Sequence, residues 1–492
     1  MRYNQPYGLP DAPSIPSPNP PDGSAFQRYV NGNPVTGTAG SIPPAGSIDE
    51  DQIEILNVII ASGLIPTHGD LTQLLQALNI MFAQRFITTH LDKTVHGSGA
   101  DFPDLHAALE WLARYVITQT GSVTFHIAGG PSSGICQSWV YTQEVVIDHP
   151  NANRVVITGA PLWGAAPIST DFRYTGFSST NRQSDAQYDL NNILRTRYSS
   201  ELIFQGGSPA GSHPNGFVIK SRGVMIQDLL ISSDQGFAGD RNSANGIYAQ
   251  ADFNADTIAI WGFGQYGMLI DNAWFEYDAG VGHDLCLVWN QGGGLVMWYG
   301  QIGHTSDIVL ASNGGNGMSL FNAGISNTPS NQLRKVYARC NAGAGINMVG
   351  GSLFQESTQS GTPGCTIYQN GGDGIDSDGA CSIYISEAAV EMNFNYGVRM
   401  FNGYMRCYLA DFGNNNQSAT LGVSGIYASD GAVVDAGNAT SAATNLNGNC
   451  SPAVNVYNTN NDSFIYWSAT LREAEELPPP PPVDEKALKI RE

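Results

Sequence analysis

A glycine followed by an apolar residue recurs through the second half of the chain, and this repeat limits the possible folds more than any other feature. Successive pairs are 21 to 29 residues apart, with a mean of about 26. The pairs are Gly246-Ile247, Gly267-Met268, Gly294-Leu295, Gly317-Met318, Gly345-Ile346, Gly374-Ile375, Gly397-Val398 and Gly425-Ile426. A period of roughly 20–30 residues is typical of solenoids, in which each coil buries its apolar face against its neighbours.

The residues between the pairs indicate β-structure. Polar turns precede many pairs, as in residues 313–317 (Asn-Gly-Gly-Asn-Gly), and we expect Gly and Asn there to adopt the positive-φ conformations of tight corners. The intervening segments alternate with period two, as in Ile383-Tyr384-Ile385. A β-propeller is the alternative, but its blades need about 40 residues and regular Trp-Asp marks. The sequence therefore predicts a mainly β chain, built as a parallel β-helix.

The N-terminal part has a different composition. Residues 1–48 contain ten of the 26 prolines, so we expect an extended arm there. Two short amphipathic helices should follow, the second capped by Asp70. Their apolar stripes are Ile53, Leu56 and Ile60 in the first helix and Leu71, Leu75 and Leu78 in the second. Two helices this small cannot bury such stripes alone, so we expect them to pack on copies of themselves or on a partner.

A third helix is predicted at about 103–116, after which the apolar period changes to two, as in Val123, Phe125 and Ile127. A helix followed by short strands is typical of a capped β-architecture. The predicted divisions are an N-terminal arm with helices (1–90), a capping helix with the first coils (91–214), the main β-helix (215–471) and a charged tail (472–492). The five consecutive prolines of the tail, 478–482, form a stiff spacer.

Charge and composition exclude several functions. The 22 Lys and Arg against 43 Asp and Glu give a net charge of −21, so counterion release from nucleic acid cannot drive binding. No apolar run is long enough to span a membrane, and the N-terminus lacks a signal-peptide pattern, so we expect assembly in a cytoplasm. The seven Cys show no zinc-ligand spacing, and we expect them to be small buried hydrophobes. No metal or cofactor is expected.

Three stretches of the chain carry a family resemblance. They are residues 29–34 with 40–45 (Tyr-Val-Asn-Gly-Asn-Pro and Gly-Ser-Ile-Pro-Pro-Ala), residues 97–105 (Gly-Ser-Gly-Ala-Asp-Phe-Pro-Asp-Leu), and residues 145–151 leading into 155–159. In that order they resemble the virion-attachment region of bacteriophage tail proteins, the helix that caps the pectate-lyase-like β-helix of tail fibres and tailspikes, and the first coils of that solenoid. The resemblance implies a homotrimer of right-handed β-helices, fixed to a phage tail or baseplate through residues 1–90 and facing host-surface glycans.

Glycan recognition requires flat apolar faces for sugar C–H groups beside hydrogen-bonding side chains. Aromatic residues crowd between positions 261 and 299, and Trp274 and Trp298 are 24 residues apart, about one coil. The two indoles are therefore expected on one face of the solenoid. The candidate glycan-binding residues are Trp261, Trp274, Tyr277, Trp289, Trp298 and Tyr299; the alternative places most of them in the interior or in an intersubunit seam.

Glycoside hydrolysis needs two carboxyl groups about 5–9 Å apart, one of them with a raised pKa. The candidate catalytic residues near the aromatic patch are Glu276, Asp278 and Asp284, and Asp307 lies one coil beyond Asp284. A second acidic set comprises Asp373, Asp376, Asp378, Glu387 and Glu391. Acidic residues are also common on the solvated surface of a protein of this charge.

The function expected from these observations is that of a structural virion protein, a tail-fibre or tailspike subunit that binds host-surface polysaccharide. One alternative is a depolymerase that cleaves capsule or lipopolysaccharide. The other is a purely structural collar or baseplate fibre without a ligand. Signatures of esterases, nucleotide-binding loops and metalloproteases are absent from the sequence.

Overall fold

The computed structural model describes residues 45–67, 70, 72–83, 86–131, 135–162, 194–205, 214–233, 244–277, 284–304, 307–327, 336–355, 365–386, 388–408, 410–412, 415, 425–435, 457–459 and 464–466. The expected arm, the tail beyond residue 471, Asp278 and Cys450 lie outside these residues. The chain divides into two compact units, one comprising Met1–Thr88 with Arg114–Thr118 and the other Thr89–Ala113 with Gln119–Glu492. The predicted boundary at residue 90 lies close to this division, whereas the capping helix and all later coils belong to one unit.

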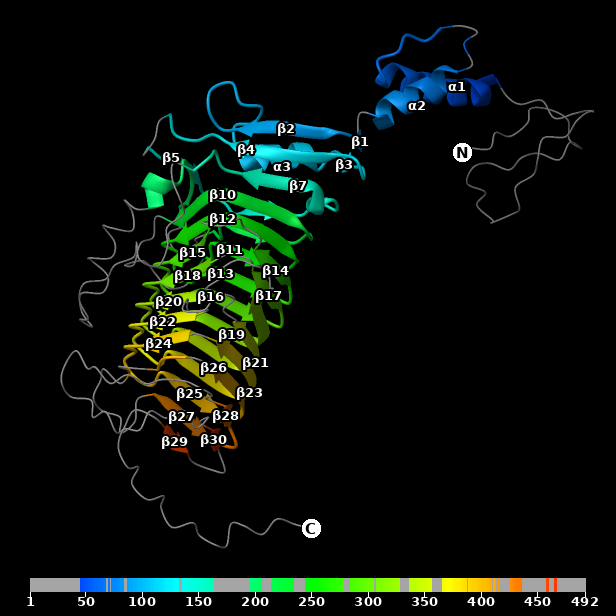
Figure 1. Ribbon diagram of the computed structural model, residues 1–492. Coiled ribbons are helices and arrows are strands. Elements are labelled where there is room, and N and C mark those ends of the chain that lie inside the picture. The colour runs from blue at the N-terminus through cyan, green and yellow to red at the C-terminus, as the bar shows by residue number, and fades with distance from the viewer. Residues whose placement is uncertain are drawn as a thin grey trace, which may run out of the picture. The chain divides into compact units, whose positions relative to one another are not determined.

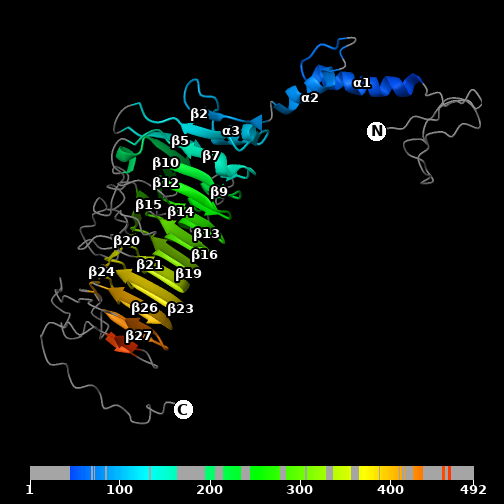
Figure 2. The same ribbon diagram turned by 45° about the vertical axis from the view of Figure 1, so that its right-hand side comes forward.

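The second unit is a parallel β-helix with three ladders of strands, and all their pairings are parallel. Figures 1 and 2 show the strands stacked along one axis. Ladder 1 contains β2 (His90–Val95), β4 (Ser122–Ile127), β7 (Val155–Thr158), β14 (Trp274–Tyr277), β17 (Gln301–His304), β26 (Gly403–Tyr408), β28 (Val433–Asp435) and β30 (Phe464–Tyr466). The mainly β fold class predicted from the repeat is confirmed.

Ladder 2 follows ladder 1 in each coil, and ladder 3 completes the coil. Ladder 2 contains β5 (Gln137–Tyr141), β8 (Ser200–Phe204), β15 (Asp284–Val288), β18 (Asp307–Ala311), β20 (Val336–Arg339), β22 (Cys365–Tyr368) and β24 (Ala388–Glu391). Ladder 3 contains β6 (Val145–Ile147), β9 (Phe217–Ile219), β11 (Ile247–Ala249), β13 (Tyr266–Asp271), β16 (Gly293–Trp298), β25 (Val398–Phe401), β27 (Ile426–Ser429) and β29 (Tyr457–Thr459).

Five long strands turn a corner and serve two ladders. β10 (Val224–Ser233) and β12 (Phe253–Trp261) run from ladder 1 into ladder 2. β19 (Asn316–Asn327), β21 (Ile346–Gln355) and β23 (Ile375–Ser386) run from ladder 3 into ladder 1. Side chains alternate between interior and exterior, as the period-two pattern predicts, and Val123, Phe125 and Ile127 of β4 are buried. Interior residues of successive coils stack, with the Phe253 and Phe275 rings 4.6 Å apart.

The corner between ladders 2 and 3 is closed by a row of buried asparagines, which we call the amide corner. Its members are Asn290, Asn313, Asn341, Asn370, Asn393 and Asn415, all fully buried. The Asn341 side chain donates to Leu310 O (2.9 Å) and Asn370 Oδ1 (3.0 Å), and its own Oδ1 accepts from the Asn313 Nδ2 (2.9 Å). From Asn290 to Asn393 each amide thus donates to the asparagine of the next coil, and these bonds satisfy polar groups that burial would otherwise leave without partners.

In the turn at residues 313–317 the expectation that Asn and Gly adopt positive φ is wrong, although Gly262 (φ 79°) does so at this corner in an earlier coil. In five coils the left-handed residue is the one before the asparagine, for example Ser312 (φ 56°) before Asn313. The repeated glycines are required by close approach between coils. A Cβ on Gly317 would lie 2.6 Å from Gly345 O and 2.7 Å from Asn341 Nδ2. The glycine repeat and the asparagine row are therefore parts of one packing arrangement.

The helices are α1 (Ala45–Ala61), α2 (Gln73–Ala83) and α3 (Leu105–Leu112), with a 3₁₀ turn at Ala152–Arg154. In the first unit α1 packs on α2, and β1 (Phe86–Ile87) pairs with β3 (Val116–Ile117). Asp70 Oδ1 accepts from the Thr72 amide (2.9 Å) just before α2. α3 is shorter than predicted and begins after Asp104, whose side chain accepts from the Ala107 amide (2.8 Å).

Several side chains of the helical pair are apolar and exposed, as the sequence predicts for helices that cannot bury their stripes. They are Ile53, Leu56, Ile60, Leu75 and Leu78. Leu71 lies outside the described residues. None of the described helices is long and apolar enough to cross a membrane. Cys286, Cys365, Cys381 and Cys407 are buried, as expected, and Cys136 and Cys340 are half-buried.

Candidate functional site

The corner between ladders 3 and 1, which we call the groove corner, is open to solvent. In this it differs from the amide corner, which is closed by buried side chains. Three successive coils have a left-handed residue at this corner. Asn272 (φ 52°) and Tyr299 (φ 53°) directly follow ladder-3 strands, and Asn322 (φ 50°) lies within β19 where that strand turns from ladder 3 into ladder 1. A shallow groove of about 420 Å³ lies over three successive coils. Its lining residues are Asn272, Ala273, Trp274, Tyr299, Gly300, Gln301 and Asn322.

Three of the predicted aromatic residues lie at this corner. Trp274 begins β14 and is 49% exposed, Trp298 ends β16 and is 48% exposed, and Tyr299 is more exposed still. In the strand register Asp271 is opposite Trp298 and Trp274 is opposite Gln301. The two indoles therefore belong to neighbouring coils, as their spacing predicts, but they flank the corner on different ladders instead of stacking.

Contacts below the groove hold these aromatic residues in place. The Trp274 amide donates to Asp252 Oδ1 (2.8 Å), and the Trp298 and Phe321 ring centroids are 5.5 Å apart. Around the rings, Asn272, Gln301 and Asn322 contribute carboxamides, while Ala273 and Gly300 leave room. Aromatic faces beside carboxamides suit a sugar, whose C–H groups pack on the rings and whose hydroxyls hydrogen-bond to amides.

Trp261 and Trp289 require a correction, because they are only 7% and 1% exposed and cannot contact a surface glycan. Their rings stack 5.7 Å apart in a cluster on the outer side of ladder 2. Leu194 and Tyr198 pack in the same cluster. The alternation of the strands by itself predicts that the outer side of ladder 2 is exposed. The structure shows that it is buried here, because Leu194 and Tyr198 pack against it.

The predicted catalytic residues are not brought together as a described pair. Glu276 is exposed and lies two residues beyond Trp274 on the same side of β14. Asp278 lies outside the described residues, as do the side chains of Tyr277 and Asp284. The backbones of Asp284 and Asp307 are directly opposite in the β15–β18 pairing, as their spacing predicts.

The second acidic set contains groups with raised pKa values near the amide corner. The pKa of Glu391 rises to about 7, first because the side chain is half-buried and then because of the neighbouring carboxyl of Asp411. Burial also raises the pKa of Asp373 to about 6, although the Arg399 guanidinium 3.1 Å away lowers it. Arg399 also binds Asp376, with 2.9 Å from Nε to Oδ1.

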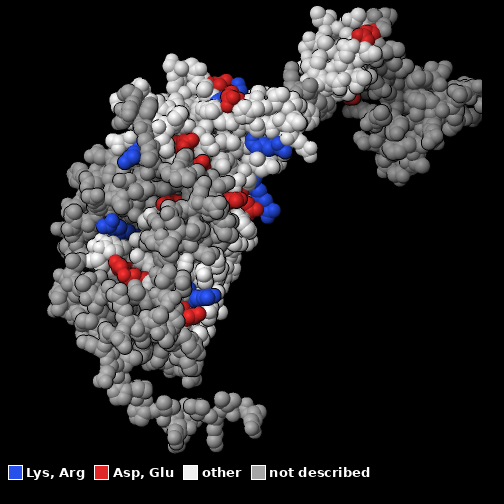
Figure 3. Space-filling model, viewed as in Figure 1, with Lys and Arg blue, Asp and Glu red and all other residues white. Residues whose placement is uncertain are grey.

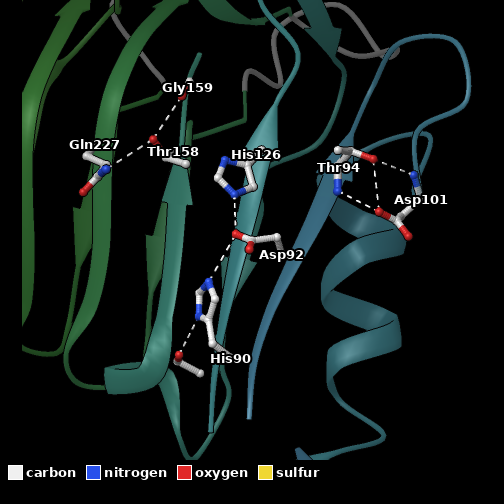
Figure 4. Close-up of polar contacts among 9 residues, drawn as sticks. His90, Asp92, Thr94, Asp101, His126, Thr158, Gly159 and Gln227 are labelled. Carbon is white, nitrogen blue, oxygen red and sulfur yellow. Dashed lines mark hydrogen bonds and ion pairs between the residues drawn. The ribbon is translucent and has the colours of Figure 1, made fainter. Parts of the chain in front are cut away.

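A third polar cluster lies on the first two strands of ladder 1 (Figure 4). Asp92 Oδ1 is 2.7 Å from His126 Nε2 and 3.2 Å from His90 Nε2, and His90 Nδ1 is 2.8 Å from Ser122 Oγ. The pKa of Asp92 is lowered by the hydrogen bond from His126 and then by that from His90. The side chains of His90, Asp92 and His126 are well exposed to solvent on the surface of the strands. The Ser–His–Asp arrangement therefore lies on an open surface and not in an enclosed substrate site.

On the surface seen in Figure 3, the described Lys and Arg side chains are scattered, and several lie beside acidic residues. Lys93 pairs with Asp101 (2.9 Å) and Arg406 with Asp435 (3.7 Å). The described residues on this view therefore form no continuous basic field of the kind that binds a phosphate backbone.

No protein-family model matches the chain, and no curated protein matches it. Solved structures that resemble it include the A-modules of the mannuronan C-5 epimerases AlgE6 and AlgE4 of Azotobacter vinelandii. The AlgE6 module is 9% identical, with 70% of this chain and 88% of that chain covered and a TM-score of 0.41. The AlgE4 module is 10% identical with the same coverage and a TM-score of 0.28. The chain is a parallel β-helix protein, and the likeness concerns this architecture alone.

Proposed function

We propose that the chain is a bacteriophage tail-fibre or tailspike subunit that binds host-surface polysaccharide at the groove corner. The observation that carries the proposal is the groove itself, where the half-exposed Trp274 and the exposed Tyr299 lie beside three carboxamides. This combination favours a neutral, hydroxyl-rich ligand. The N-terminal and capping sequences that resemble phage tail proteins support a place in the virion, on the tail or baseplate.

In this proposal the first 90 residues attach the chain to the tail, and the subunit is a homotrimer. The exposed aliphatic side chains of α1 and α2 support a protein partner, because water-exposed Ile53, Ile60 and Leu75 gain free energy when another apolar surface covers them. Light scattering of the full-length chain should give three times the monomer mass. The Leu75→Glu variant should lower that mass, and a monomeric wild-type chain would contradict this part of the proposal.

The function is tested by incubating the purified full-length chain with a panel of bacterial capsular polysaccharides and lipopolysaccharides. Bound protein and glycan size are measured in the same samples. Binding to an intact glycan that is weakened by Trp274→Ala supports the adhesin. Absence of binding across the panel would favour the structural collar or baseplate fibre.

A depolymerase is the second candidate, because the Glu276 carboxylate lies on the same exposed side of β14 as Trp274. A sugar bound on the indole would therefore lie near one of the two carboxyl groups that glycoside hydrolysis requires. Shortened glycan in the same assay supports this activity, and Glu276→Gln should then abolish shortening while binding remains. If Glu276→Gln shortens the glycan as fast as the wild type does, Glu276 has no catalytic role.

A further inference from the structure

A second group of aromatic side chains lies on ladder 1, further along the solenoid from the groove. The Phe354 and Tyr384 rings stack 4.8 Å apart at an angle of 14°. The Arg406 guanidinium lies 5.8 Å from the centre of the Tyr384 ring, and Tyr404 is exposed beside it on β26. We call Phe354, Tyr384, Tyr404 and Arg406 the distal platform.

The strand register connects the distal platform to the groove on one face. The register aligns two columns of residues along ladder 1 from β14 to β26. The first is Trp274, Gln301, Gly324, Ser352, Ser382 and Tyr404, and the second is Glu276, Gly303, Ser326, Phe354, Tyr384 and Arg406. Five strand steps separate Trp274 from Tyr404, which is roughly 24 Å at about 4.8 Å per step.

The residues between the two aromatic groups are small. Gly303, Gly324 and Ser352 give the centre of this face low side chains, while large rings stand at both ends. These small residues leave room for an extended ligand along the ladder, with its ends on the rings. The direction of such a ligand follows the solenoid axis, because the columns do.

The chemistry of the face favours a glycan over a protein. Neither column contains a Leu, Ile, Val or Met between β14 and β26, whereas α1 and α2 expose large aliphatic side chains such as Ile53, Ile60 and Leu75. A protein interface of this size is expected to have an apolar core. Rings combined with Gly, Ser and Gln match sugar C–H faces and hydroxyls instead.

We infer that the distal platform is a second subsite for the same polysaccharide chain, so that one glycan segment spans from Trp274 to Tyr404. This inference rests on the proposed function and extends it: the ligand is a linear polysaccharide recognised over several sugars. The Tyr404 and Phe354 rings pack on a sugar at the far end, and Arg406 donates hydrogen bonds to its hydroxyl groups.

The test uses the first polysaccharide of the panel that the wild-type chain binds, cut into fragments from disaccharides to long oligomers. The dissociation constant is measured for each length with the wild type, Trp274→Ala, Tyr404→Ser and Phe354→Ala. Tyr404→Ser and Phe354→Ala should each weaken the long fragments at least tenfold and leave disaccharide binding unchanged. Trp274→Ala should weaken every length.

Phe394→Ala serves as the matched control, since Phe394 is exposed near the amide corner, away from the two columns. It should bind all lengths as the wild type does. Equal affinity of Tyr404→Ser, Phe354→Ala and wild type for long fragments overturns the second subsite while the groove proposal stands. If the wild type binds no polysaccharide, both proposals are overturned. Urea unfolding midpoints of each variant show whether lost binding reflects lost folding.

Discussion

The amide corner and the groove corner belong to the same coils and differ in what their side chains do. Both contain left-handed residues, such as Ser312 at one and Asn322 at the other. At the amide corner the next side chain, Asn313, turns inward and bonds to the neighbouring coil. At the groove corner Trp274 and Tyr299 project into solvent. Left-handed turns thus place buried, hydrogen-bonded amides at one corner and exposed aromatic side chains at the other.

This comparison indicates that stability and recognition can be altered separately. A substitution at the amide corner leaves buried hydrogen-bonding groups of two coils without partners. A change at the groove corner alters a surface that is already in contact with water. The predictions below test this separation, beginning with the largest effect.

Asn341→Ala should lower the free energy of unfolding by about 3–5 kcal/mol, because it removes two donated bonds and leaves the amide of Asn313 without its acceptor. Urea denaturation measures the change. Asn322→Gly at the groove corner is the control, since glycine accepts the left-handed φ, and it should cost less than about 1 kcal/mol. Equal losses in the two variants would show that the corners do not differ in stability.

Tryptophan substitutions should give opposite results at the two corners. Trp274→Ala should weaken polysaccharide binding about 10- to 100-fold and leave the urea midpoint nearly unchanged. Trp289→Ala should cost about 3–5 kcal/mol of stability because it empties a buried site. A Trp289 variant that is fully stable but loses binding would reverse our assignment of the two residues.

The pKa of Glu391, raised to about 7, should make stability depend on pH. The folded state holds this proton more tightly than the unfolded chain does, so the contribution is fully present below about pH 4.5 and is lost as pH rises through 7. We expect wild type to lose about 1–2 kcal/mol between pH 5 and 8 through this half-exposed group. In Glu391→Gln the urea midpoint should vary less over that range, while binding at the groove corner stays constant with pH. An unaltered pH profile in the variant would remove Glu391 as the cause.

Tyr299→Gly should produce the smallest change in stability. A tyrosine at φ 53° is strained, so glycine relieves the backbone by up to about 1 kcal/mol while the groove loses a ring. Calorimetry should therefore show a melting temperature equal to or above that of wild type, together with weaker polysaccharide binding. A lower melting temperature would mean that the Tyr299 ring contributes packing that outweighs its strain.

The sequence predicted the solenoid because its repeat is a local pattern that each coil must satisfy. Glycines such as Gly317 and Gly345 recur where coils approach closely, and alternating residues such as Val123 and Phe125 divide inside from outside. The role of Asn313 was misjudged for a related reason. Composition shows that an asparagine lies in a turn, but not whether its side chain meets water or the next coil.

The candidate site was only partly predictable. Residue spacing placed Trp274 and Trp298 in neighbouring coils but could not show that a corner separates them. Likewise, nothing local distinguishes the buried Trp289 from the exposed Trp274. The distal platform was not foreseen at all, because Phe354, Tyr384 and Tyr404 meet only when three coils are in register.

The sequence by itself determined the coil length, the inward and outward alternation, and the helices that leave apolar stripes exposed. These follow from local propensity and the period of buried residues, which act within one coil. Tertiary structure alone decided which outward face is covered, which corner is closed by amides, and which aromatic side chains share a surface. Those outcomes depend on strand register and on contacts between segments far apart in the chain, because a side chain is buried only when another segment packs against it.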